Sequence, residues 1–147
     1  MAAVRHAEVA WDGDLMSGSG TIRYVSSGTL TRLPVSWASR TEAHDGHTSP
    51  EELLAAAHAS CYAMAFSGGL ARNGTPATHL EVRAVVTFDK TDEGWRVVSS
   101  ALTVEGTVPG IDETKFVELA MAAKDGCPIS QALKGNVALS VVPTLVG

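Results

Sequence analysis

The chain has 147 residues, of which 45% are hydrophobic and 18% charged, and its formal net charge is −5. Because single domains commonly contain about 100–150 residues, we expect one domain over residues 1–147, with a core that needs no disulfide. The acidic balance and the scattered basic residues argue against nucleic acid as a partner.

The N-terminal residues 1–8 contain no apolar signal core. The longest uncharged run, residues 53–71, is interrupted by a histidine, serines and glycines, which argues against a membrane span. The sequence therefore favours a cytoplasmic protein, in which both cysteines would start as reduced thiols.

The N-terminal part alternates turn signals with β-rich segments. Turn-forming residues occupy 11–14 and 17–20, and β-forming residues occupy 21–25 and 33–38. We expect an antiparallel meander here, followed by a polar loop over residues 41–49.

A strong helix start follows the polar loop. Ser49 can cap the helix, Pro50 suits its first position, and Glu52 completes a capping box with Ser49. We expect this helix to run from Pro50 to about Arg72. It is apolar or small on nearly every side, which is typical of a core helix. Because a chain of this length has difficulty covering such a helix, we expect a partner subunit to help, as in a homodimer.

The rest of the chain predicts a hairpin, two helices and a last strand. The expected elements are strands 80–89 and 95–108 around a turn at 90–94, a helix at 113–124 capped by Asp112, a short helix that begins at 127–128, and a strand at 137–142. The order βββ-α-ββ-αα-β predicts an α+β fold with antiparallel sheets.

Cys61 lies in the long helix, and a thiol reacts well only as a thiolate. It is about three turns from the N-terminus of the helix, where the dipole has little effect, and burial alone would raise its pKa. If Cys61 is reactive, it therefore needs a neighbouring cation. Arg40, expected at the end of a strand, is the candidate, and Glu51 could orient its guanidinium.

Helix geometry places Glu51 and Cys61 about 15 Å apart along one helix, at about 1.5 Å per residue. They are poorly placed to share an arginine within a single straight helix. If two such helices pack across a dimer, Glu51 of one chain could approach Cys61 of the other. We therefore consider a site that is completed by the second subunit.

Cys127 directly precedes Pro128, which predicts that it is the N-cap of a short helix. Free backbone N–H groups at that position stabilise a thiolate and make the cysteine a good leaving group.

The residues alone leave simpler interpretations open. Both cysteines could be inert small core residues, and His58 could be a packed helix histidine rather than a proton acceptor. His44 and His47 could form a metal site or lie in a solvated loop, and the absence of a C-x-x-C pair gives structural zinc little support. Glu51 could simply complement the start of the helix.

Several segments together resemble the OsmC/Ohr family of thiol peroxidases, and more closely its OsmC (osmotically inducible protein C) branch. The resemblance covers nearly the whole chain. Its segments are Trp11-Asp12-Gly13-Asp14, Ser39-Arg40, Ser49-Pro50-Glu51-Glu52-Leu53 followed by Ala55-Ala56-Ala57-His58-Ala59-Ser60-Cys61, Val108-Pro109-Gly110-Ile111-Asp112, and Ala123-Lys124-Asp125-Gly126-Cys127-Pro128-Ile129-Ser130.

The resemblance implies an intertwined homodimer, in which two sheets wrap central helices and two active sites lie at the subunit interface. By position, Cys61 would be the peroxidatic thiol and Cys127 the resolving thiol, while Arg40 would activate Cys61 and Glu51 would hold Arg40. The implied reaction reduces organic hydroperoxides through a Cys61 sulfenic acid and a Cys61–Cys127 disulfide. It uses no metal or cofactor, and a lipoylated protein or small dithiol restores the thiols.

Two other functions fit the same fold. A redox sensor would form the same disulfide without turnover, and a small-ligand-binding protein would leave both cysteines inert.

Overall fold

The computed structural model describes residues 1–147, which form two compact units, Met1–Leu53 and Leu54–Gly147. The prediction that the whole chain is one domain stays a prediction. The predicted order of elements is found, with one additional short helix before the long one.

The first unit contains a three-stranded antiparallel sheet, which confirms the predicted meander. Its strands are β1 (Ala7–Asp12), β2 (Ser19–Val25) and β3 (Thr31–Val35), and β2 is in the centre.

The prediction that residues 33–38 form one strand is wrong at its C-terminal end. β3 stops at Val35, and the short helix α1 (Trp37–Thr41) begins directly afterwards. The reason is a capping box: Ser36 Oγ accepts a hydrogen bond from Ser39 N–H at 3.1 Å, and Ser39 Oγ accepts one from Ser36 N–H at 3.0 Å. Arg40 therefore lies in the last turn of a helix and not at the end of a strand.

The long helix α2 (Pro50–Arg72) has the predicted bounds. Ser49 Oγ accepts a hydrogen bond from Glu52 N–H at 3.1 Å, which is one half of the predicted capping box. The Glu52 carboxylate, however, accepts a hydrogen bond from the Thr48 hydroxyl at 3.3 Å. By length and composition α2 is also apolar enough to cross a membrane, a test that core helices of soluble proteins pass as well.

As the sequence predicts, the single chain does not cover α2 on every side. Tyr62, Phe66 and Leu70 are completely buried, whereas the side of α2 that carries Met64 is exposed, and Met64 itself is 74% exposed. The apolar composition of α2 is therefore matched by burial on one side only.

The second sheet has the order β4-β5-β6 and is mixed, which corrects the prediction of antiparallel sheets only. β4 (His79–Thr91) and β5 (Gly94–Thr107) form the predicted antiparallel hairpin. β6 (Ala138–Leu145) pairs with β5 in parallel, because the chain crosses over through α3 (Glu113–Gly126) and α4 (Pro128–Leu133) before it returns to the sheet.

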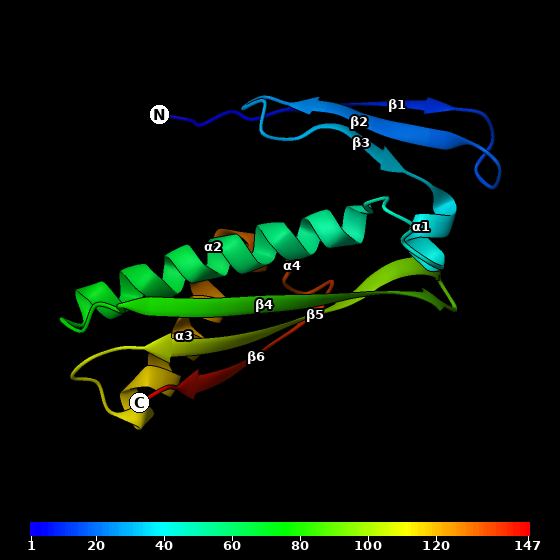
Figure 1. Cartoon of the computed structure of the whole chain (residues 1–147). Helices are drawn as coiled ribbons and strands as arrows, with labels where there is room; N and C mark the ends of the chain where they lie inside the picture. The colour runs from blue at the N-terminus through cyan, green and yellow to red at the C-terminus, as the bar shows by residue number, and fades with distance from the viewer. The chain divides into compact units, whose positions relative to one another are not determined.

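Helix α3 begins as predicted, because Asp112 Oδ1 accepts a hydrogen bond from Lys115 N–H at 2.8 Å. Aromatic contacts join the two long helices: the rings of Phe66 on α2 and Phe116 on α3 lie 5.2 Å apart. Figure 1 shows α2 running along the length of the β4–β6 sheet. The core of the second unit comprises Tyr62, Phe66, Leu70, Leu102, Val104, Val108, Phe116, Ala120, Ala123, Cys127 and Val141.

Candidate functional site

The two cysteines of the chain are brought together in the second unit. Cys61 is on α2, and Cys127 occupies the junction between α3 and α4. Both are free thiols, and their side chains are joined by a hydrogen bond. Cys127 is completely buried, whereas Cys61 is partly exposed. A thiol that a small molecule can reach thus lies in contact with a second thiol that is shielded from solvent.

Cys127 is the N-cap of α4, with Pro128 at the first helical position, as the sequence predicts. Burial disfavours its thiolate, but hydrogen bonds from Cys61 and from the Ser130 and Ile129 groups outweigh burial, so that the Cys127 pKa lies below its ordinary value. Its side chain forms no standard capping hydrogen bond. The start of α4 therefore favours the thiolate through the Ser130 hydroxyl and the backbone of Ser130 and Ile129, and not through a capping bond.

The pKa of Cys61 is raised, first by burial and second by the hydrogen bond to Cys127, while the Ile129 backbone opposes the shift. Of the two hydrogen-bonded thiols, Cys127 is therefore the more easily deprotonated, and the proton that they share favours Cys61. This direction agrees with the expectation that α2 itself does not activate Cys61.

Arg40 and Glu51 form an ion pair within the first unit. Arg40 Nε donates to Glu51 Oε1 and Oε2 at 3.0 and 3.1 Å, and Nη2 donates to Oε1 at 2.8 Å. The Glu51 side chain is 9% exposed, so that water screens this pair only weakly. The guanidinium also lies over the Trp37 ring, 5.9 Å from its centre. The orientation of Arg40 is thus set from two sides.

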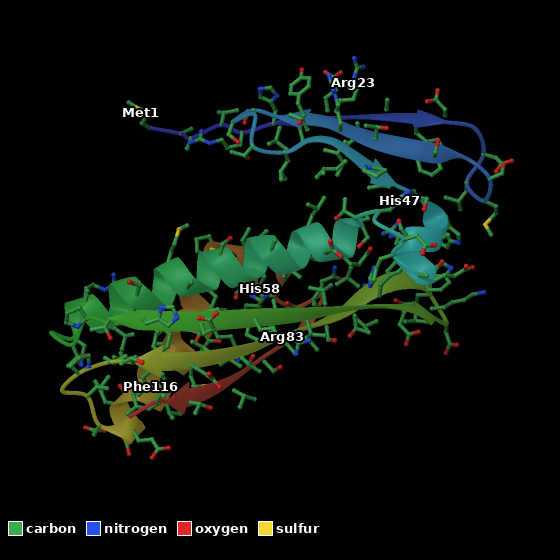
Figure 2. The ribbon with its side chains drawn as sticks, viewed as in Figure 1. Met1, Arg23, His47, His58, Arg83 and Phe116 are labelled. Atoms are coloured by element: carbon green, nitrogen blue, oxygen red, sulfur yellow. The ribbon has the colours of Figure 1, made fainter.

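His58 was expected to be a packed helix residue without an evident acidic partner. It is completely buried, and both ring nitrogens have partners: Nδ1 lies 2.6 Å from Ser100 Oγ, and Nε2 lies 2.8 Å from Ser130 Oγ. It extends from α2 toward the second sheet (Figure 2). Sequence reasoning missed both serines, because they are far away in the chain and belong to β5 and α4.

The remaining candidates lie in the loop before α2. His44 and Asp45 are exposed, and His47 is half-buried. No group of three or more potential metal ligands is present in the structure.

The model of the family described as "OsmC-like protein" matches residues 43–142. Peroxiredoxin OsmC of Escherichia coli (strain K12) is 40% identical over 139 residues, which are 95% of this chain and 96% of the relative. The organic hydroperoxide resistance protein OhrB of Bacillus subtilis (strain 168) is 32% identical over 92 residues, which are 61% of this chain and 65% of the relative.

Solved structures show the same fold. The crystal structure of Bacillus subtilis OhrB aligns with a TM-score of 0.71 at 26% identity, over 96% of this chain and 98% of that chain. An organic hydroperoxide resistance protein from Elizabethkingia anophelis aligns with a TM-score of 0.76 at 20% identity, over 99% and 100% of the two chains, a likeness of fold alone.

Proposed function

This chain belongs to the OsmC-like protein family, and on that premise we propose that it is a cysteine-based peroxidase that reduces organic hydroperoxides and, less readily, hydrogen peroxide. The observation that carries the proposal is the hydrogen bond between the Cys61 and Cys127 side chains, one accessible and one buried. The names of the relatives, a peroxiredoxin and an organic hydroperoxide resistance protein, support it. The role in the cell would be defence against oxidative and osmotic stress.

The first step oxidises Cys61. Its thiolate attacks the distal oxygen of the hydroperoxide, the O–O bond breaks, and Cys61 becomes a sulfenic acid. The proton that the two thiols share passes to the departing alkoxide, which leaves as the alcohol. The peroxide gains two electrons from the Cys61 sulfur, and Cys127 is left as a thiolate.

The second step joins the two cysteines. The Cys127 thiolate attacks the Cys61 sulfur, the S–S bond forms, and the S–O bond breaks. The departing hydroxide takes a proton from solvent and becomes water. A dithiol, either a lipoylated protein or a small thiol, then reduces the disulfide to two thiols and is itself oxidised to a disulfide. Because the thiols supply all electrons, the cycle requires no metal or prosthetic group.

The first step needs a positive charge beside Cys61, which Arg40 would supply while Glu51 holds it in place. We propose that the Arg40 guanidinium stabilises the Cys61 thiolate and the negative charge that develops on the departing oxygen. Glu51 would hold Arg40 in the orientation that its bidentate ion pair defines. This role explains how Cys61 reacts although burial raises its pKa.

The proposed assembly is a homodimer in the cytoplasm. Its support is the exposed side of α2, where a helix of core-like composition carries an exposed methionine, Met64. A second copy of the chain would cover this side.

The test is peroxidase turnover with cumene hydroperoxide and an excess of dihydrolipoamide, in the wild type, Cys61→Ser and Cys127→Ser. We expect the wild type to turn over many times, Cys61→Ser to be inactive, and Cys127→Ser to accumulate the sulfenic acid without forming the intramolecular disulfide. Consumption of one equivalent of peroxide by the wild type would favour the redox sensor. Mass spectrometry after stoichiometric peroxide, without the loss of two hydrogens, would favour the ligand-binding protein and remove the peroxidase.

A further inference from the structure

The proposed reaction cycle gives no role to His58, a buried titratable side chain. His58 is completely buried, as are Ser100 and Ser130, its two hydrogen-bond partners, within about 1%. Ser130 is the third residue of α4, three positions after the resolving cysteine, and its hydroxyl and backbone both act on the Cys127 sulfur. A chain of buried polar groups therefore leads from His58 through Ser130 to Cys127.

In the proposed second step Cys127 acts as a thiolate, and that charge at one end of the chain fixes the direction of its hydrogen bonds. A thiolate only accepts, so the Ser130 hydroxyl donates to Cys127. Ser130 Oγ then accepts from His58 Nε2–H, at 2.8 Å. His58 Nδ1 in turn accepts from the Ser100 hydroxyl, at 2.6 Å. Every bond in the chain points toward the sulfur, and His58 is assigned the neutral tautomer with its proton on Nε2.

We propose that His58 is a positioning residue for disulfide formation, which acts through Ser130 to keep Cys127 ready to attack the oxidised Cys61. The inference rests on the proposed function and adds to it a residue that touches neither peroxide nor sulfur. After the first step, Cys127 must persist as a thiolate until it attacks. The chain of hydrogen bonds holds the Ser130 hydroxyl on that thiolate, with the sulfur oriented at the start of α4.

His58 acts as a hydrogen-bond donor and not as a base. Burial lowers the His58 pKa, which keeps the ring neutral at physiological pH. A neutral ring has one N–H to donate and one nitrogen to accept, which is what its two serine partners require.

The other titratable groups around Cys127 come from α2, α3 and α4. Cys61 donates to it, and the Tyr62 hydroxyl, buried beside it, donates to the Ala120 carbonyl at 2.9 Å. Ser130 also lines a cavity of about 220 Å³ together with Lys124, Asp125 and Lys134. Among these groups, it is His58 that forms the side-chain hydrogen bond to Ser130 Oγ, from Nε2 at 2.8 Å.

The test separates the resolving step from the peroxidatic step. In Ser130→Ala and His58→Phe, which remove the last donor of the chain and the donor before it, we expect Cys61 sulfenic acid to form at the wild-type rate. Disulfide formation should slow about tenfold or more, the usual effect of losing a hydrogen bond to a charged group. Ser130→Thr keeps the hydroxyl and should restore the rate. Ser60→Ala removes an exposed hydroxyl of α2 and is the matched control.

A second measurement does not depend on peroxidase activity. Titration of the Cys127 thiolate by its ultraviolet absorbance, in a Cys61→Ser background, should move to higher pH in Ser130→Ala and His58→Phe and return in Ser130→Thr. Unchanged titration together with an unchanged rate of disulfide formation would overturn the inference. If the wild type shows no peroxidase turnover but the titration moves, the proposed function fails while the chain of hydrogen bonds stands.

Discussion

Arg40 and Glu51, one on the last turn of α1 and one on the first turn of α2, are locked together by three hydrogen bonds of 2.8 to 3.1 Å. The carboxylate accepts from both Nε and Nη2, so that the plane of the guanidinium is fixed and not only its position. A rigid cation of this kind costs no reorganisation when charge develops next to it.

Replacing Glu51 by glutamine should lower kcat/KM for cumene hydroperoxide about tenfold, because a charge-assisted hydrogen bond of about 1.5–3 kcal/mol to Arg40 is weakened. Stopped-flow measurement of Cys61 oxidation tests this directly. Glu52→Gln is the matched control, since Glu52 is the next residue of α2 but is exposed. Equal losses in both variants would show that the effect comes from the charge at the start of the helix and not from the ion pair.

Replacing Arg40 by lysine keeps the charge but removes the planar fork that binds Glu51. We expect Cys61 oxidation to slow about 100-fold, in the range found when one donor to a developing charge is lost. Arg23→Lys serves as the control, because Arg23 pairs with Glu8 on the surface of the first unit, with 58% of its side chain exposed. An Arg40→Lys protein as fast as Arg23→Lys would exclude Arg40 from the reaction.

If the site is completed by the second subunit, a heterodimer of Glu51→Ala and Cys61→Ser chains should regain one working site. Each homodimer lacks either the orientation of Arg40 or the peroxidatic thiol. Each heterodimer should therefore have half the turnover of a wild-type dimer, and random subunit exchange in an equal mixture of the two purified variants should recover about a quarter of the wild-type turnover. Turnover no greater than the sum of the two variants measured separately would contradict a site made by both chains.

The exposed side of α2 predicts where the dimer forms. Introducing a charge at Met64, which is 74% exposed in the single chain, should shift the protein from dimer to monomer, because a charge buried at an interface without a partner is costly. Analytical ultracentrifugation of Met64→Glu measures the effect. Val142→Glu, at an exposed position of β6, is the comparison and should leave the dimer intact. A dimeric Met64→Glu protein would place the interface elsewhere.

Stability should depend on pH through His58. Since burial lowers its pKa in the folded state, the unfolded chain binds a proton that the folded chain does not. The stability that His58 contributes is thus complete above about pH 6.5 and is lost as the pH falls below that value. Urea unfolding at several pH values measures the free energy of unfolding. As the pH falls, this free energy should decline less in His58→Phe than in wild type or in His44→Gln, an exposed control. Parallel declines in all three proteins would contradict this.

Local signals predicted most of the fold, because the bounds of α2, the β4–β5 hairpin and the cap of α3 depend on residues close in sequence. Two features of the fold were not predicted from the sequence, for different reasons. The short helix α1 depends on a serine pair, Ser36 and Ser39, within a segment of high β propensity. The parallel pairing of β6 depends on the path of the chain between β5 and β6, which composition does not encode.

In the candidate site, too, some residues were predicted from the sequence and others were not. The position of Cys127 before Pro128 revealed its place at the start of α4, and the resemblance named its partner Cys61. The bonds of His58 to Ser100 and Ser130 join residues 42 and 72 positions away, and no local pattern marks such serines. Hydrogen bonds between residues of distant elements can be identified only once the packing of those elements is known.

The two bonds of His58 also determine how α2 docks. Much of this helix consists of alanine, serine and glycine, so that a shift by one turn would present a nearly equivalent apolar surface to the sheet. An imidazole that must meet β5 with one nitrogen and α4 with the other accepts a single rotation and a single axial position. Among the several alignments that the small apolar residues of α2 would allow, His58 therefore selects one.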